Sequence, residues 1–491
     1  MTAVIVALLT LPLAAMRPFQ QPTAERAATA ATTSGTAVPA IPESFKVSIS
    51  QPPAPPASPA TTSEQASSAT LPAPKPIQAV TPSSAWSCDS YSRRGRSGTH
   101  ISHHDGDGTA QILNYVVSSG SRCAEAALVG RARFSADESR IAELSPGGFA
   151  RFRERTEAVD RAVSVTPAAD GSLSYTALMN GRTVAFDETM QAWLARFLPE
   201  VLREAAINVP ERVARLRDRG GIPAVLSEVG QIRSTGAKRA HYEEILKTPL
   251  SAGDAEKVTT QAGRDLVASS GDLSAVIQQL PRSSMRTSQT RQAVAGALSQ
   301  IRSSGDKSST LRVLAPHADA EMLIVLARAA EDLPSSGDKA NFLIATASEY
   351  LTPGTESLRN AFFKTASTLQ SSGDMANVLI SSIPYGHSSS AVALQVVATS
   401  KGLASSGDAA NVLLSLISQR AVQPGNTRAT LAIIERTLTM ASSGDRANVL
   451  ISLATTNLVS NSELREAFTK AAMALPSDGD RANVLAAAAR R

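Results

Sequence analysis

The sequence predicts a mainly α-helical protein, an α-solenoid of helix-pair repeats that follows a small antiparallel β module and a disordered proline-rich linker. Three observations support this fold class. The tetrapeptide Ser-Ser-Gly-Asp occurs six times without change between residues 269 and 445. Apolar residues make up 43% of the 491 residues but aromatic residues only 4%, so the core must consist of Ala, Leu, Ile and Val. Prolines are concentrated between residues 18 and 84.

The tetrapeptide marks a repeat whose aspartates are 32 to 37 residues apart. A degenerate copy, Ser477-Asp478-Gly479-Asp480, and an earlier relative, Ser234-Thr235-Gly236-Ala237, extend the series to eight. Eight copies at a period of about 35 define a repeat array over residues 234–491. The Trp and Gly-Tyr signature of tetratricopeptide repeats is absent. We therefore interpret the array as a generic right-handed α-solenoid.

Each tetrapeptide is predicted to start a helix. Its first Ser is a favoured N-cap residue, and the Asp three residues later completes a capping box and faces the positive end of the helix. We expect these structural helix caps at Asp272, Asp306, Asp338, Asp374, Asp408, Asp445 and Asp480.

Five of the units continue with Ala-Asn-Val-Leu or Ala-Asn-Phe-Leu, which places an Asn at the same point of each helix. We expect these side chains to bond backbone groups of the adjacent repeat; the alternative is that they bind a ligand along one groove. The repeated residues are Asn341, Asn377, Asn411, Asn448 and Asn483. A second helix follows in each unit, such as residues 356–369, and the pair is stabilised by stacking on its neighbours.

Residues 85–187 alternate between apolar and polar positions in short runs, which is typical of a small antiparallel β module. The dipeptide Asn180-Gly181 predicts a tight hairpin turn. Residues 188–233 show helical spacing and are interpreted as bridging helices, the second of which ends near Gly220. The expected strands are residues 127–135, 140–144, 149–156, 161–165, 173–180 and 183–186.

Cys88 and Cys123 are the two cysteines, and we expect them to form a disulfide in an oxidising compartment. Two thiols are too few for a four-ligand zinc site. The run between them from His100 to Asp107 is interpreted as a polar loop, and no metal or cofactor site is assigned. The alternative is a metal site formed by His103, His104 and Asp105.

The N-terminal segment, residues 1–17, carries an uncharged apolar run at residues 2–16 that fits a signal or membrane-anchor segment. One explanation for its missing basic start is that Met1 lies within the last membrane helix of a longer polypeptide; the alternative is a buried or cytosolic helix. The linker, residues 18–84, is expected to be extended, because proline removes backbone donors and stops helices. It would space the folded part from an anchor.

Charge and motif content exclude several functions. A net charge of +5 is small for 491 residues, and aromatic platforms are scarce, so nucleic acid is not an expected partner. The six histidines do not recur with the repeated serines, so no nucleophile with a neighbouring base is predicted.

The order of segments resembles the extracytoplasmic part of certain bacterial membrane metallopeptidases that are similar to beta-lactam-sensing antirepressor receptors. The resemblance rests on the segment order and on two phrases, Arg140-Ile-Ala-Glu-Leu-Ser-Pro-Gly-Gly148 and Leu226-Ser-Glu-Val-Gly-Gln-Ile-Arg-Ser234. The catalytic His-Glu-x-x-His of that family is absent, since no His is followed by Glu. The resemblance therefore implies no peptidase activity for this chain.

The sequence thus favours a non-enzymatic protein of the cell envelope, periplasmic or membrane-tethered, that binds a protein or peptide on its repeat surface. Two alternatives stay open. One is the sensor portion of a signalling membrane metallopeptidase, and the other is a metal-dependent hydrolase that uses the His-rich run.

Overall fold

The computed structural model describes residue 88 and residues 98–106, 110–119, 121–386 and 390–490. The expected anchor segment, residues 1–17, and the expected linker, residues 18–84, lie outside the described residues. Within the described part of the chain, none of the helices has the length and apolar character needed to span a membrane. The predicted fold class is confirmed: the protein is mainly helical, and an antiparallel sheet precedes the helices.

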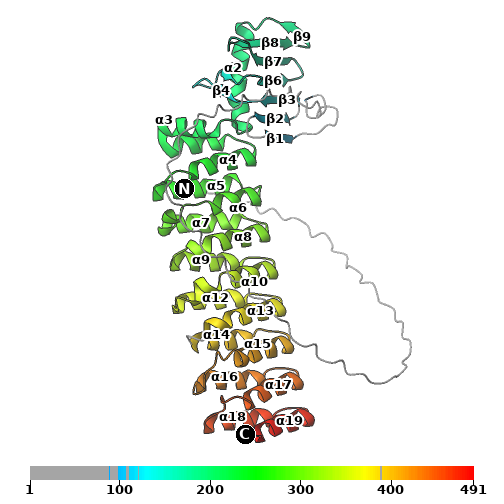
Figure 1. Cartoon of the computed structure of the whole chain (residues 1–491), viewed down its shortest axis with the longest axis vertical. Helices are drawn as coiled ribbons and strands as arrows, with labels where there is room; N and C mark the ends of the chain where they lie inside the picture. The colour runs from blue at the N-terminus through cyan, green and yellow to red at the C-terminus, as the bar shows by residue number, and fades with distance from the viewer. Residues whose placement is uncertain (1–87, 89–97, 107–109, 120, 387–389, 491) are drawn as a thin grey trace, which may run out of the picture. The chain divides into compact units, whose positions relative to one another are not determined.

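A seven-stranded sheet forms the β module, and every neighbouring pair of its strands is antiparallel (Figure 1). The hairpin predicted at Asn180-Gly181 is present, with positive φ at both residues (50° and 77°). In sheet order the strands are β1 (Gly98–Gly106), β2 (Ala110–Ser119), β3 (Arg122–Val129), β6 (Phe149–Arg155), β7 (Asp160–Pro167), β8 (Leu173–Met179) and β9 (Arg182–Val184). A separate pair consists of β4 (Ala132–Phe134) and β5 (Ile141–Leu144).

The prediction of a loop for the His-rich run is wrong. The run lies mostly in β1, which pairs with the apolar strand β2 in a register that sets His100 opposite Val116. Tertiary pairing with β2 gives the segment a strand conformation that its own polar sequence does not suggest. The side chains of His103, His104 and Asp105 lie outside what the structure describes, so the alternative metal site stays a prediction.

Helix α2 (Glu188–Glu204) belongs to the β module rather than to a bridge. Its buried face, which includes Trp193, Phe197 and Val201, packs into one hydrophobic cluster with sheet residues such as Phe152. A sheet must cover its apolar face with another layer, and α2 provides that layer. Helix α3 (Val209–Gly230) is instead part of the array core, and its backbone leaves helical geometry at the predicted end, where Gly221 has a φ of 65°.

Two rows of helices make up the repeat array (Figure 1). Each first helix of a repeat contacts the first helix of the next repeat, and the second helices contact one another in the same way. The first helices are α4 (Thr235–Leu246), α6 (Ser270–Gln278), α8 (Ser304–Leu314), α10 (Ser336–Ala345), α13 (Ser372–Ser382), α15 (Ser406–Ser418), α17 (Ser443–Ala454) and α19 (Asp478–Ala489). The second helices are α5 (Ala252–Asp265), α7 (Ser288–Gln300), α9 (Ala320–Glu331), α12 (Glu356–Ser367), α14 (Ser390–Ser400), α16 (Thr427–Leu438) and α18 (Ser462–Met473).

Short helical turns complete the array. They are η1 (Arg282–Arg286), η2 (Ala315–His317), α11 (Ala347–Leu351) and η3 (Ile383–Gly386).

One hydrophobic cluster runs through the array from Val209 to Val484 and consists mainly of Ala, Leu, Ile and Val. Small residues allow close approach: a Cβ added to Gly263 would lie 3.3 Å from Cα of Ala297, where α5 meets α7. This agrees with the aromatic-poor core expected from composition. The described array has one cluster of aromatic contacts, which centres on Tyr350 and Phe362.

Candidate functional site

The first serine of each tetrapeptide caps the helix that follows. In all seven copies from Ser269 to Ser477 its Oγ accepts a hydrogen bond from the backbone N–H of the Asp, at 3.1–3.3 Å. The expected capping box is wrong, because no Ser backbone N–H donates to the carboxylate three residues later in the described residues. The aspartates Asp272, Asp306, Asp338, Asp374, Asp408, Asp445 and Asp480 instead lie half-buried in the first turn of each helix.

The second serine links one repeat to the next. Its Oγ accepts a hydrogen bond from the backbone N–H of the first serine in the following copy, at 3.1–3.3 Å. We call this set the serine ladder; its acceptors are Ser270, Ser336, Ser372, Ser406 and Ser443. In these five copies the bond uses the N–H that a capping box would need, and in a sixth the N–H of Ser269 donates to the backbone oxygen of Leu266 at 2.9 Å.

The serine ladder is interrupted at Ser304. Its Oγ is buried and has no hydrogen-bond partner among the described residues. The step to the next copy is the shortest in the array, 338 − 306 = 32 residues. A different hydrogen bond connects the two repeats here, from Ser308 Oγ to the backbone oxygen of Asp338 at 2.9 Å.

The five repeated asparagines are exposed, and none has a hydrogen bond within the described part of the chain. The expectation that they bond backbone groups of the adjacent repeat is therefore wrong. The serine ladder already fills that role, and three residues after the Asp the helix presents its outer face. These side chains, Asn341, Asn377, Asn411, Asn448 and Asn483, form a row on consecutive first helices, which we call the asparagine row.

An aliphatic side chain accompanies most members of the asparagine row, three residues further along the helix and therefore on the same face. Ile344 is 41% exposed, and Ile380, Leu414 and Ile451 are half-buried against the core. Five of the seven repeat aspartates, from Asp338 to Asp480, lie three residues before an asparagine of the row. Asp272 approaches Arg239 at 3.7 Å, whereas the other six make no ion pair within 4.0 Å in the described residues.

Two cations, buried Lys339 and half-buried Arg446, donate hydrogen bonds to the C-terminal ends of second helices. Lys339 Nζ donates to the backbone oxygens of Glu331 (2.9 Å) and Thr368 (3.2 Å), and burial lowers its pKa. Arg446 Nε likewise donates to the backbone oxygen of Met440 at 2.6 Å. Unpaired carbonyls at a helix end favour a positive charge. These side chains therefore hold the repeats together and do not face a ligand.

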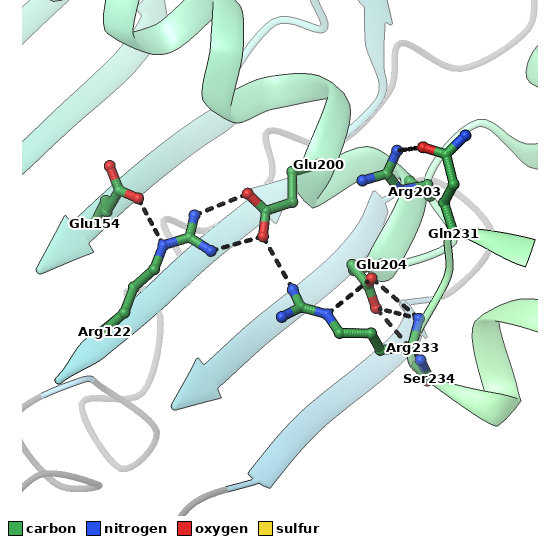
Figure 2. Close-up of polar contacts among 8 residues, drawn as sticks. All are labelled: Arg122, Glu154, Glu200, Arg203, Glu204, Gln231, Arg233 and Ser234. Atoms are coloured by element: carbon green, nitrogen blue, oxygen red, sulfur yellow. Dashed lines mark hydrogen bonds and ion pairs between the residues drawn. The ribbon is translucent and has the colours of Figure 1, made fainter. Parts of the chain in front are cut away.

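A chain of ion pairs connects the sheet to the first repeat (Figure 2). Arg122 on β3 donates to Glu154 on β6 at 2.7 Å and makes two bonds of 2.8 Å to Glu200 on α2. Glu200 also accepts from Arg233, which directly precedes the first repeat, at 3.0 Å. The two-bond contact between guanidinium and carboxylate fixes both position and orientation.

Glu204 completes this junction. It is 1% exposed and accepts hydrogen bonds from the backbone N–H groups of Arg233 (3.1 Å) and Ser234 (3.3 Å). Ser234 is the N-cap of α4, so a carboxylate of the β module holds the start of the array. This role of Glu204 was not predicted from the sequence. The available signal was a carboxylate on the apolar face of α2, seven residues after Phe197, which requires a partner when buried.

The surroundings at this junction shift the pKa values of two acidic groups, Glu200 and Tyr115. Arg122 holds the pKa of the Glu200 carboxyl below its usual value, mainly through their hydrogen bonds. Burial raises the pKa of Tyr115, and the charges of Glu204 and Glu200 add to that shift. Trp193 Nε1 occupies the second oxygen of Glu154 at 2.8 Å. Glu154 and Glu200 thus accept hydrogen bonds from arginine and tryptophan side chains of the protein itself. Together these bonds join the β module to the first repeat of the array.

The disulfide lies beside this junction. Cys88 and Cys123 are bonded, with 5.7 Å between their Cα atoms, and Cys123 follows Arg122 directly on β3. The backbone N–H of Cys88 donates to Glu125 at 3.3 Å. Residue 88 is therefore fixed to the centre of the sheet.

The described histidines outside the sheet do not share a site. His241 is fully buried, its Nδ1 lies 2.8 Å from the backbone oxygen of Ala237, and burial lowers its pKa. His317 lies 2.7 Å from Arg282. Among the described residues, no three His, Cys, Asp or Glu side chains come together as a metal site.

Comparisons of the chain with protein-family models, with curated proteins and with solved structures give no match.

Proposed function

We propose that the protein is a non-enzymatic interaction scaffold that binds an extended polypeptide across the first helices of its repeats. The observation that carries this proposal is the asparagine row, five exposed amides at equivalent positions with no partner among the described residues. An asparagine with only a structural role is expected to make hydrogen bonds within the protein. These five amides make none among the described residues and face solvent.

The chemistry of the row suits a polypeptide backbone. An Asn side chain both donates and accepts, so it can bond the N–H and the C=O of a passing peptide. Helices in contact lie about 8–10 Å apart, which corresponds to about three residues of an extended chain. The neighbouring aliphatic side chains, such as Ile380 and Leu414, offer apolar contact beside each amide. We infer one amide contact for every third residue of the partner.

The junction supports a scaffold role as well. Its carboxylates and His241 are engaged in contacts within the protein, so none of these groups is a free base for catalysis. For localisation we propose the cell envelope, periplasmic or membrane-tethered, because the apolar segment at residues 2–16 and the paired cysteines fit an oxidising compartment.

The test is affinity capture from envelope extract with the full chain and with a variant that carries Asn377→Ala, Asn411→Ala and Asn448→Ala. Each lost bond contributes about 0.5–1.5 kcal/mol, so we expect a specific partner to be recovered at least about tenfold less.

A matched control variant carries Ser357→Ala, Glu466→Ala and Lys470→Ala, which are exposed residues of second helices. It is expected to capture as well as the unchanged chain. Equal recovery by both variants, or no partner together with catalytic turnover by the pure protein, would contradict the proposal.

A second candidate function is the sensor portion of a signalling membrane metallopeptidase. The observation in its favour is the ion-pair junction from Arg122 to Arg233, which suits the transfer of a binding event between the β module and the array. Reading the genomic DNA upstream of Met1 tests it. An in-frame membrane domain with His-Glu-x-x-His supports this candidate, and a stop codon in that frame directly upstream counts against it.

A further inference from the structure

A second surface lies on the other row of helices, away from the asparagine row. A groove of about 510 Å³ crosses the second helices α12, α14 and α16. Half-buried Leu394 and Leu431 and several alanines form its floor. Arg359, Lys401 and Arg428 lie along its borders, together with Glu356 and Glu435.

Helix α14, which lies in the middle of the groove, differs from the other second helices in its charge. Residues 390–400, Ser-Ala-Val-Ala-Leu-Gln-Val-Val-Ala-Thr-Ser, include no charged side chain, whereas every other second helix carries at least one. An uncharged helix thus lies between two charged neighbours, α12 and α16.

Charges on consecutive second helices pair elsewhere in the array. Arg291 of α7 meets the N-cap residue Asp319 of α9 at 2.7 Å, and Lys364 of α12 meets Glu331 of α9 at 2.9 Å. Across α14 no such pairing is available. In the described residues, Arg359, Lys401 and Arg428 make no ion pair within 4.0 Å, although each borders the groove. Arg359 Nη1 donates one hydrogen bond to the backbone oxygen of Gly354, and its other guanidinium nitrogens have no hydrogen bond among the described residues.

We propose that this groove binds an acidic segment of a partner protein in extended conformation. The residues that line the groove include three cations but only two carboxylates, so the groove has a net positive charge. One of these carboxylates, Glu356, lies one helical turn before Arg359 on α12. The N-terminal ends of α12 and α16, where Arg359 and Arg428 lie, add the positive end of a helix dipole. Partner carboxylates take the places opposite these two arginines.

The spacing specifies the segment further. Arg359 and Arg428 are two helix spacings apart, about 16–20 Å, which an extended chain covers in about five or six residues. Leu394 and Leu431 line the path between them. The partner segment therefore has two carboxylates six residues apart, because an even spacing places both on the same face of an extended chain, with aliphatic side chains on that face between them. Because the groove shares no residue with the asparagine row, the inference stands apart from the proposed function.

The probe is the fluorescein-labelled peptide Glu-Ala-Leu-Ala-Leu-Ala-Glu, titrated with the full chain and followed by fluorescence anisotropy. We expect saturable binding that weakens at least about tenfold in the variant R359E/R428E, since each arginine loses a charge-assisted bond and gains a repulsion. The variant Ala398→Glu, which supplies a charge on α14, is expected to weaken binding as well. Circular dichroism verifies that each variant is folded.

Two controls make the outcome specific. The same peptide with Lys in place of Glu is expected to bind at least about tenfold more weakly, and Asn411→Ala is expected to leave binding unchanged. The inference is overturned if no saturable binding occurs up to about 1 mM peptide. It is equally overturned if R359E/R428E binds like the unchanged chain, or if the lysine peptide binds equally well.

Discussion

The β module and the repeat array bury their apolar surface in different ways. In the β module, large side chains such as Phe152 and Trp193 pack between one sheet and one helix, and ion pairs and a disulfide join residues far apart in sequence. In the array, small aliphatic residues pack between successive helices, and a repeated hydrogen bond between two serines connects five pairs of neighbouring units. Stability in the module is thus collective, whereas in the array it is a sum of similar local steps.

The two regions can be followed separately, which makes the comparison testable. The chain has two tryptophans, Trp86 and Trp193, and neither belongs to the array. In a Trp86→Phe background, the fluorescence of the buried Trp193 therefore reports on the module, while far-ultraviolet circular dichroism is dominated by the helices of the array.

The largest effect is expected from Leu413→Ala in the middle of the array. Leu413 is fully buried, so the substitution should cost about 3–5 kcal/mol of unfolding free energy through lost burial and a cavity. In urea unfolding, the circular dichroism midpoint should fall while the fluorescence midpoint changes little. The control is Leu485→Ala, at the equivalent position of α19, which is 39% exposed and should cost far less. Equal losses in the two variants would mean that the repeats do not form a stacked core.

The disulfide should affect the module alone. Replacing Cys88 and Cys123 by Ser removes a link between residues 35 positions apart and should cost about 3–4 kcal/mol in the chain-entropy model. The expected readout is the reverse of the previous one: a lower urea midpoint by fluorescence and an unchanged one by circular dichroism. A matching shift of both midpoints would show that the module and the array unfold as one unit.

The serine ladder offers a comparison inside the array. Ser406→Ala leaves the N–H of Ser442 without its acceptor and should cost about 1–3 kcal/mol. Ser304→Ala removes a buried hydroxyl that has no partner, so it should be neutral or slightly stabilising. The measurement is the unfolding free energy of both variants, obtained from urea unfolding followed by circular dichroism. Similar losses at the two positions would contradict the role assigned to the ladder.

The smallest expected effect is the pH dependence of the junction. The pKa of Glu200 is lower in the folded protein than its ordinary value of about 4.5, so its contribution to stability is present above that value and is lost as pH falls through the folded pKa. Part of the effect is screened by solvent, because Glu200 is half-exposed to it. Fluorescence-detected urea unfolding between about pH 3 and pH 6 should show a loss at low pH that is smaller in Glu200→Gln.

The helical repeats were predictable because each carries its own start signal and apolar face. The hairpin at Asn180 was predictable for the same local reason. Strand β1 was not, since its conformation depends on pairing with β2, and the boundary that assigns α2 to the module depends on which surface covers the sheet. The exposure of the asparagines was not predicted, because the hydrogen bond between repeats comes from Ser406 and its equivalents.

The central claim is that the asparagine row is the binding surface, and site-specific photo-crosslinking tests it most directly. A photoreactive amino acid placed at position 411 on α15, and separately at position 466 on the outer surface of α18, compares the row with a second helix of the same array. If the asparagine row binds the partner, we expect a discrete crosslinked product from position 411 in envelope extract and none from position 466. A discrete product only from position 466, or none from position 411, would contradict it.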